Sequence, residues 1–598
     1  MVIWSTLFSN PNRDNYRYAV VIKTEAYQDP AWQEVADSLL KIHDGFMSKL
    51  FKWDGTIAEI KNELSLFRPD YIGVIGRPVT DVTSDFVHSV HQLCRDLDED
   101  IYADAVYGII TGYEAADALR AIQDSVIVKT AIIAHQGQDF SGFHDPSGFP
   151  GYRHFYQTVY TSEGGNDYPA TQYNFADGTV FKENKALDNQ PDRVITYSNW
   201  LNSDSIKISV PGQGEIAGTF DLFSTSGHGN INSWQAQFPS PQVEGFIRSE
   251  AGTLYGDPQS GDDITITVKT PKLYLATGNC LIGQPDDVDN MVYAWFHTGR
   301  AVNMFGYIVT SGYGYMGWGN YERFVHFPGL YSAAECYFIT NQSLLMDINN
   351  TTPGVDISQL EHYKDNTILY GDPKAVAYSM SFGDSACIYL QDLKRIQAPD
   401  SAIPDTFIYT VSPHHHDLDG GNSFKSFYHA YRPFQFLPAR IDQKSVAIEQ
   451  NDGHVAVITD NFVLWDLLHT NEKIAKGDVK TLRWTAKVTE DMTAVQLFTK
   501  KKCSSNKARL KVFPSSDAHS LVIHYVGGIS DNITVSLYSA MGKRLLCETV
   551  YNSARPLKNK FLLSLKNEGN NILGNGVYWV VVNDGTVTSI RKIIALLR

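Results

Sequence analysis

The sequence FDLFSTSGHGNINSW at residues 220–234 joins a short apolar run to a polar, glycine-rich turn that contains His228. The sequence KLYLATGNC at residues 272–280 repeats this pattern and ends in Cys280. A short apolar run bounded by turn residues is typical of a buried strand in a parallel sheet. Open α/β sheets place their ligands at the carboxyl ends of such strands. We therefore expect two strands that each bring one reactive side chain to the same sheet edge.

A histidine and a cysteine at one sheet edge suit nucleophilic attack on a carbonyl. A thiol is only a few per cent thiolate at neutral pH and an amide leaving group must be protonated, so a nearby imidazole serves both steps. The glycines that flank His228 allow a substrate to approach, and the N–H groups of Gly229 and Cys280 are candidate oxyanion donors. The alternative is a hydrogen-bonded turn histidine and a small buried cysteine.

The order of these motifs resembles the gingipain family of caspase-type cysteine peptidases. In that family the motif GHG, four residues and Trp precedes the nucleophile, and GHGNINSW stands at residues 227–234. A helix expected at 291–300 and a strand expected at 301–311 follow Cys280, as they follow the nucleophile in the family. The phrase NTILYGDP at 366–373 is similar to the end of such catalytic domains. The resemblance spans about residues 16–376.

This resemblance implies a caspase-like α/β catalytic region, a parallel sheet flanked by helices in two subdomains. We place the N-terminal α/β subdomain at 16–125 and the caspase-like catalytic subdomain at 126–376. Short alternating runs separated by turns follow, which predicts a β-sandwich domain at 377–500 and a separate β domain at 510–598. Through the run GVYWVVV at 576–582, the last domain resembles Ig-like carboxy-terminal sorting domains, which implies secretion through the type IX route.

Several local patterns predict individual elements of the first subdomain. Apolar residues at helical spacing predict a helix from Trp32 to Phe51. Capping-box pairs predict helix starts at Thr56 with Glu59 and at Thr111 with Glu114. These helices should alternate with buried strands, as in a parallel sheet with helices on both faces.

A third catalytic residue is expected after the strand predicted at Val126–Ala134. The resemblance implies an acidic residue there that orients the catalytic histidine, and the nearest match is Gln136. Asp139 and Asp145 are alternatives for this role and for an acidic floor of the substrate pocket.

Aromatic residues on a glycine-rich loop are candidates for a wall of the substrate pocket. The loop SGYGYMGWG at residues 311–319 follows the strand expected beside that of Cys280, and it carries Tyr313 and Trp318. The alternative is that these rings only pack beneath the loop.

Three polar segments leave a choice between a cation site and an ordinary loop. The acidic residues of 98–104 suit calcium or a solvated loop, and those of 284–289 suit a cation or the cap of the following helix. The histidines of 413–419 suit a metal or a surface loop. Calcium as a structural ion is the one cofactor that the sequence suggests, and no metal is expected at the catalytic centre.

Composition excludes several classes of protein. At 598 residues the chain is too long for one core, and its net charge of -16 leaves no basic stripe for a nucleic-acid partner. Six scattered cysteines imply no disulfide framework. No apolar run reaches the roughly 18 residues of a membrane helix, and no signal peptide is visible.

Together these features predict a secreted or cell-surface cysteine endopeptidase that acts on proteins or peptides through Cys280 and His228. Its C-terminal domain would meet a secretion machinery. One alternative is a catalytically inactive, peptidase-like protein that binds or adheres at the cell surface. A metal-dependent hydrolase built on His414–His416 is a weaker alternative, because it lacks a separate ligand set and a general base.

Overall fold

In the computed structural model the chain divides into two compact units, Met1–Val495 and Gln496–Arg598. The structure describes residues 16–43, 47–128, 194–204, 220–235, 245–311, 314–352, 355–379, 387–400, 403–413, 432–467 and 474–489 with their side chains, apart from those of 325 and 326. It describes Asp417 and the backbone of the further helices and strands given below as well.

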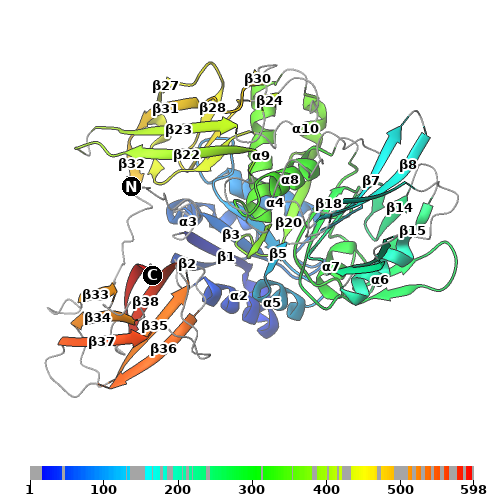
Figure 1. Ribbon diagram of the computed structural model, residues 1–598, viewed down its shortest axis with the longest axis horizontal. Coiled ribbons are helices and arrows are strands. Elements are labelled where there is room, and N and C mark those ends of the chain that lie inside the picture. The colour runs from blue at the N-terminus through cyan, green and yellow to red at the C-terminus, as the bar shows by residue number, and fades with distance from the viewer. Residues whose placement is uncertain are drawn as a thin grey trace. The chain divides into compact units, whose positions relative to one another are not determined.

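A twelve-stranded sheet forms the centre of the first unit (Figure 1), with the order β2-β1-β3-β4-β20-β19-β18-β12-β6-β7-β8-β9. In chain order its strands are β1 Arg17–Lys23, β2 Met47–Trp53, β3 Tyr71–Ile75, β4 Val106–Ile110, β6 Ala131–Ala134, β7 Phe155–Glu163, β8 Asn166–Asn174, β9 Val180–Asn184, β12 Leu222–Ser226, β18 Lys272–Gly278, β19 Ala301–Tyr307 and β20 Thr367–Tyr370. Neighbours run parallel except at β19–β20, β7–β8 and β8–β9. Strands β3, β4, β12 and β19 are buried along their whole length, as expected of strands covered on both faces.

Helices flank this sheet. They are α1 Thr24–Gln28, α2 Pro30–Ile42, α3 Lys61–Phe67 after a 3₁₀ turn at Ile57–Ile60, α4 Ser84–Arg95, α5 Ala115–Gln123, α6 Arg193–Ser203, α7 Met291–His297, α8 Tyr315–His326, α9 Ala333–Asn350 and α10 Ile357–Tyr363. A large, mostly parallel sheet between helices fits the caspase-like α/β class (Figure 1). In the described part of the chain, no helix combines the length and the apolar character that a membrane span needs.

The helix predicted from Trp32 to Phe51 is too long. Helix α2 ends at Ile42, and residues 47–53 form strand β2, which pairs in parallel with β1. His43 follows the helix, and its buried ring contacts the Tyr16 hydroxyl at 2.9 Å and the Asp372 carboxylate at 3.2 Å. Phe51 and Trp53, two positions apart, are both buried. This period of two belongs to a strand.

The two predicted capping boxes have different outcomes. The box of Thr56 and Glu59 is confirmed at the turn that precedes α3. The box predicted at Thr111 and Glu114 is wrong, because the N-cap of α5 is Glu114 and its partner is Asp117. Thr111 is fully buried close to the end of β4, one turn too early to begin the helix.

The single strand predicted at Val126–Ala134 is two strands. The first part, β5 Val126–Val128, pairs with β21 Ala377–Ser379, and only the second part, β6, belongs to the central sheet. The chain changes sheet here because β21 provides β5 with a separate partner. The later helix and strand predictions hold with shorter bounds, since α7 ends at His297 and β19 ends at Tyr307.

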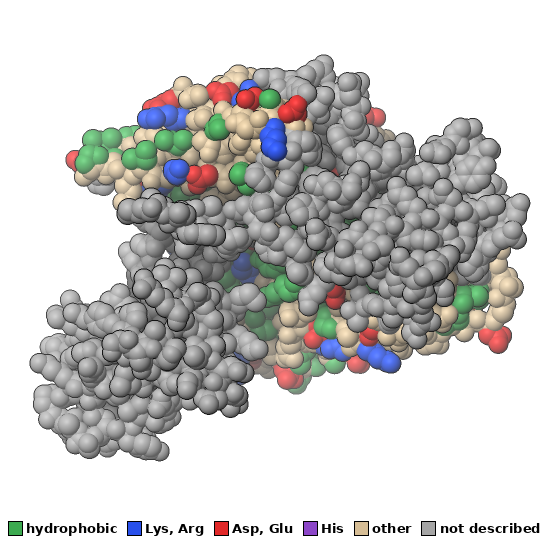
Figure 2. Space-filling view, in the orientation of Figure 1, with side chains coloured by type: hydrophobic (Ala, Val, Ile, Leu, Met, Phe, Trp, Pro, Cys, Tyr) green, Lys and Arg blue, Asp and Glu red, His purple; other side chains and the backbone are tan. Residues whose placement is uncertain are grey.

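The first unit also contains antiparallel sheets between residues 389 and 490. Their strands are β22 Tyr389–Ile396, β23 Asp405–Pro413, β24 Leu418–Asp419, β25 Phe434–Phe436, β26 Arg440–Ile441, β27 Ala447–Gln450, β28 Ala456–Ile458, β29 Phe462–Trp465, β30 Lys473–Ile474, β31 Lys480–Ala486 and β32 Val488–Glu490. Hydrophobic side chains gather on the surface at one end of β22 and β23 (Figure 2), where Ile396 and Ile403 are about half exposed. A buried arginine, Arg432, joins this region to α9 through the carboxylate of Asp347 at 2.6 Å.

The second unit consists of antiparallel strands in the described part of its chain. One sheet contains β33 Arg509–Pro514, β34 Ser520–Val526 and β37 Lys558–Ser564, in that order. The other contains β36 Arg544–Tyr551, β35 Asn532–Ser539, β38 Gly576–Asn583 and β39 Thr588–Ala595. The structure gives backbone alone for these strands.

Candidate active site

The turns that carry His228 and Cys280 leave the central sheet side by side. Strands β12 and β18 are parallel neighbours, with Thr225 opposite Ala276 and Ser226 opposite Gly278. His228 lies two residues after β12 and Cys280 two residues after β18. Both turns therefore begin at the carboxyl edge of adjacent strands, where open α/β sheets bind ligands.

The turn after β12 is held by backbone geometry and by a tryptophan. Gly227 has φ 106°, a conformation that side-chain-bearing residues rarely adopt. The buried Trp234 lies opposite Gly229 in a short hairpin, and its indole N–H donates to the Ser226 carbonyl at 3.0 Å. The tryptophan of the GHG-containing motif thus anchors the base of the histidine turn.

Gly229 packs directly against the backbone that carries the cysteine. A Cβ placed on Gly229 would lie 2.8 Å from the Cys280 carbonyl oxygen and 2.9 Å from Cγ1 of Ile282. Contacts this short have no room for a methyl group, so the position requires glycine. The residue after His228 and the residue predicted as the nucleophile are therefore in backbone contact.

The Cys280 thiol is partly exposed and is held by the segment that follows β19. The Ser311 N–H donates to Sγ at 3.1 Å, and Sγ lies 3.7 Å from the Ser311 carbonyl oxygen. The next residue, Leu281, has φ 59°, and its N–H donates to the Val309 carbonyl at 3.0 Å. A left-handed leucine costs of order 1 kcal/mol, and such strained residues cluster at functional sites.

The His228 side chain is exposed, while its backbone is fixed. Its carbonyl accepts the Gln235 N–H at 2.9 Å across the short hairpin. Within the described part of the chain, the imidazole has no hydrogen bond. A group that passes a proton to a substrate must be reachable in this way.

Of the other predicted site residues, the structure describes Trp318. Gln136, Asp139, Asp145 and Tyr313 lie outside the described residues. Trp318 lies on α8 and is only 4% exposed, with its indole against Gly314 and near Gly278. In the described structure it therefore packs behind the cysteine turn, which agrees with the packing alternative.

The acidic segment after Cys280 caps a helix, but not the one expected. Asp286 accepts the Ser84 N–H at 2.7 Å and the Ser84 hydroxyl at 2.6 Å, at the start of α4. The N-cap of α7 is Asn290, whose side chain accepts the Tyr293 N–H. Of the two alternatives for residues 284–289, the cap of the following helix is therefore wrong. His414–His416 lie outside the described residues.

The acidic segment 98–104 contributes to a carboxylate cluster. Ligand oxygens of Asp98, Asp104 and Asp460 lie within 4.8 Å of one another. Asp104 is 8% exposed, and burial together with the charges of Asp98 and Asp460 raises its pKa to about 9. Arg440 donates to one oxygen of Asp460 at 2.9 Å, while the other has no hydrogen bond within the described residues.

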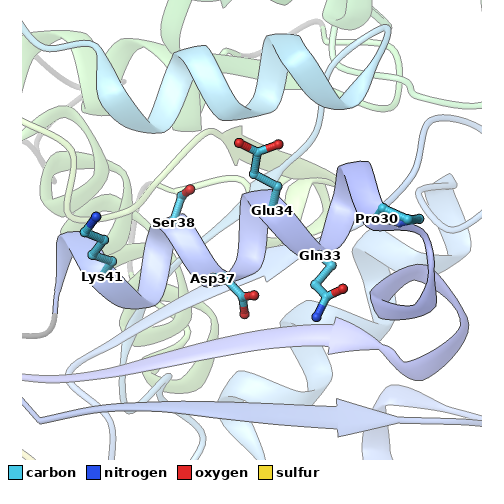
Figure 3. Close-up of a pocket in the computed structure, with 6 residues that line it drawn as sticks. All are labelled: Pro30, Gln33, Glu34, Asp37, Ser38 and Lys41. Atoms are coloured by element: carbon cyan, nitrogen blue, oxygen red, sulfur yellow. The ribbon is translucent and has the colours of Figure 1, made fainter.

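A hollow of about 400 Å³ lies elsewhere on the first unit (Figure 3). It is lined by Pro30, Gln33, Glu34, Asp37, Ser38 and Lys41. All six belong to α2, and none is a candidate catalytic residue. The hollow therefore adds no group to the chemistry of the cysteine and histidine turns.

Sequence reasoning missed the residues that join the two turns. Thr225, Asn279 and Ser311 make the hydrogen bonds that hold the turns, and Asp460 completes the acidic cluster. A polar residue directly before Cys280 was a usable signal, because the apolar run before it predicts burial. Asp460 had no local signal.

No protein-family model matches the chain, and no curated protein matches it. Among solved structures, the Arg-specific cysteine proteinase gingipain R (RGPB) is 10% identical, with 90% of this chain and 98% of that chain covered and a TM-score of 0.37. Dimeric latent PorU from Porphyromonas gingivalis is 9% identical, covers 97% of this chain and 64% of its own, and has a TM-score of 0.23. A β-glucuronidase from Ruminococcus gnavus is 11% identical over 32% of this chain and 36% of its own, with a TM-score of 0.10. At these scores the similarities say nothing about activity.

Proposed function

We propose that the chain is a secreted or cell-surface cysteine endopeptidase. The observation that carries this proposal is the backbone contact between Gly229 and Cys280 at the carboxyl edge of β12 and β18. This contact joins the turn that carries His228 to the backbone of Cys280, a partly exposed cysteine, and it supports a Cys/His pair of the kind that nucleophilic cysteine catalysis uses.

In the proposed reaction, His228 takes the thiol proton of Cys280 and the thiolate attacks the scissile carbonyl carbon. The carbonyl electron pair moves to oxygen, where the N–H groups of Gly229 and Cys280 stabilise the oxyanion. One such donor is worth about 10² or more in rate in comparable sites. Collapse of the tetrahedral species breaks the C–N bond, and His228 returns the proton to the leaving amine. Water then hydrolyses the thioester and regenerates the thiol.

The groups that surround this dyad stay predictions. Gln136, Asp139 or Asp145 would orient His228 or form the pocket floor, and Tyr313 would form a pocket wall. The C-terminal domain would engage a secretion machinery, which motivates the proposed location outside the cell.

A structural calcium ion belongs to the same proposal. The oxygen-only donor set of Asp98, Asp104 and Asp460 suits a hard cation, because calcium is bound by oxygens at about 2.3–2.6 Å and tolerates irregular geometry. Asp104 and Asp460 each have one buried carboxylate oxygen that receives no hydrogen bond from the residues that the structure describes, and these oxygens fit the same ion. The bound ion would supply charge compensation and would join the segment before β4 to the β28–β29 turn.

The proposal is tested by digestion of a proteome-derived peptide library with the full-length protein under reducing conditions, with calcium present. New amino termini identified by mass spectrometry in the wild type, and absent with Cys280→Ser and His228→Ala, would support it. A library left intact by the folded wild type would favour the alternative of a catalytically inactive surface-binding protein.

A further inference from the structure

A directional chain of hydrogen bonds links the two candidate catalytic turns through the side chain of Asn279. The Thr225 hydroxyl donates to Oδ1 of Asn279 at 2.7 Å, and Nδ2 of Asn279 donates to the Gly227 carbonyl at 3.2 Å. Gly227 directly precedes His228, and Asn279 directly precedes Cys280. The side chain of Asn279 is fully buried.

The orientation of the Asn279 amide follows from its partners. The Gly227 carbonyl can only accept, so Nδ2 must face it and Oδ1 must face the Thr225 hydroxyl. Because that hydroxyl has one proton to give, the buried Tyr274 hydroxyl at 2.9 Å donates to Thr225 in turn. The direction of each hydrogen bond in this series is thereby fixed by its neighbour.

Position 279 needs a side chain that both accepts and donates a hydrogen bond. Aspartate has the same shape, but it would place a second acceptor against the Gly227 carbonyl and bury a charge. Leucine has a similar branched shape and a larger volume, but it would leave the Gly227 carbonyl and the Thr225 hydroxyl without their partner. Asparagine supplies one acceptor and one donor at the spacing that the two turns present.

We propose that Asn279 is a positioning residue that sets the His228 turn relative to Cys280. This inference rests on the proposed function. It assigns the residue an effect on proton transfer between imidazole and thiol that a purely packing residue would not have. A displacement of about 1 Å at a reacting group can cost on the order of 100-fold in rate.

The test measures alkylation of Cys280 by iodoacetamide as a function of pH, with the Cys280 peptide quantified by mass spectrometry. This readout needs no peptidase activity. The compared proteins are the full-length wild type, His228→Ala, Asn279→Leu, and the pair Thr225→Val and Thr225→Ser. Asn303→Ala is the matched control, because Asn303 is an equally buried asparagine that donates to two backbone carbonyls on β20 and at Asp372.

Asn279→Leu and Thr225→Val should shift the pH profile toward that of His228→Ala, while Thr225→Ser, which keeps the hydroxyl, should retain the wild-type profile. Where turnover is measurable, Asn279→Leu should lower kcat about 100-fold with little change in KM. Asn303→Ala should lower the Tm yet keep the wild-type profile.

A wild-type profile in Asn279→Leu would overturn the inference, and so would an equal shift in Asn303→Ala or identical profiles for wild type and His228→Ala. A result that refutes the proposed function can be told apart from one that refutes this inference. A wild type that cleaves no peptide, but whose profile depends on both His228 and Asn279, would remove the peptidase and keep the positioning role.

Discussion

The backbone N–H of Ser311 donates to Sγ of Cys280 across 3.1 Å. This hydrogen bond joins the segment after β19 to the turn after β18, so that two neighbouring strands of the sheet define the place of one sulfur atom. Because the donor belongs to the backbone, its direction is set by the fold and not by a side-chain rotamer.

Replacing Ser311 by proline removes this donor. We expect Ser311→Pro to slow alkylation of Cys280 about tenfold or more, since a hydrogen bond to a charged group contributes about 1.5–3 kcal/mol. Ser311→Ala, which keeps the N–H, should react as the wild type does. Equal alkylation rates in the proline and alanine variants, at equal Tm, would show that the Ser311 N–H does not affect the reactivity of Cys280.

Gly229→Ala should disturb the contact between the two turns. Its methyl group would meet the Cys280 carbonyl at 2.8 Å, and overpacking of this kind costs about 1–3 kcal/mol. We expect a lower Tm and a loss of Cys280 labelling by iodoacetamide. Gly453→Ala is the control, because that glycine has φ 82° with nothing within 4 Å of a Cβ. It should lower the Tm while labelling continues, and unchanged labelling in Gly229→Ala would contradict the prediction.

Stability should fall as pH rises through the range in which Asp104 stays protonated. Its pKa is raised to about 9, whereas an unfolded aspartate titrates near 4. The folded state thus binds one proton more between these values. Its free energy of unfolding decreases with pH by at most about 1.4 kcal/mol per unit. In the absence of divalent cations, the Tm of Asp104→Asn should fall less steeply between pH 5 and pH 8 than the Tm of the wild type. A control, Asp262→Asn, changes an exposed carboxylate and should behave as the wild type.

Calcium should reverse this loss of stability. An ion that binds only the folded protein at 100 times its Kd adds about 2.7 kcal/mol, so the Tm at pH 8 should rise with added calcium chloride. The rise should be absent in Asp460→Asn and present in Asp262→Asn. Isothermal titration calorimetry with calcium alone gives a second readout. A Tm that calcium leaves unchanged in the wild type would remove the proposed site.

The two strands β12 and β18 could be predicted because their signals are local. Each strand is a short apolar run, and each run stops at small polar residues that include a glycine. Helix boundaries were predicted less well where tertiary contacts decide. The side chain of His43 contacts the core at the end of α2, and a strand begins four residues later, although apolar residues continue at helical spacing.

The hydrogen bonds between the turns could not be predicted, because they join residues more than fifty positions apart whose side chains also suit ordinary loops. Thr225 and Asn279 are common turn residues, and only the parallel register of β12 and β18 brings their side chains together. Asp460 lies in another sheet region, so burial and charge at Asp104 become visible only in three dimensions.

Covalent labelling of the intact protein tests the central claim most directly. A library of peptidyl acyloxymethyl ketones is incubated with the wild type under reducing conditions with calcium, and adducts are mapped by mass spectrometry. We predict an adduct on Cys280, slower labelling in His228→Ala, and none at this position in Cys280→Ala. A folded wild type in which no probe modifies Cys280 would contradict the claim that this thiol is a catalytic nucleophile.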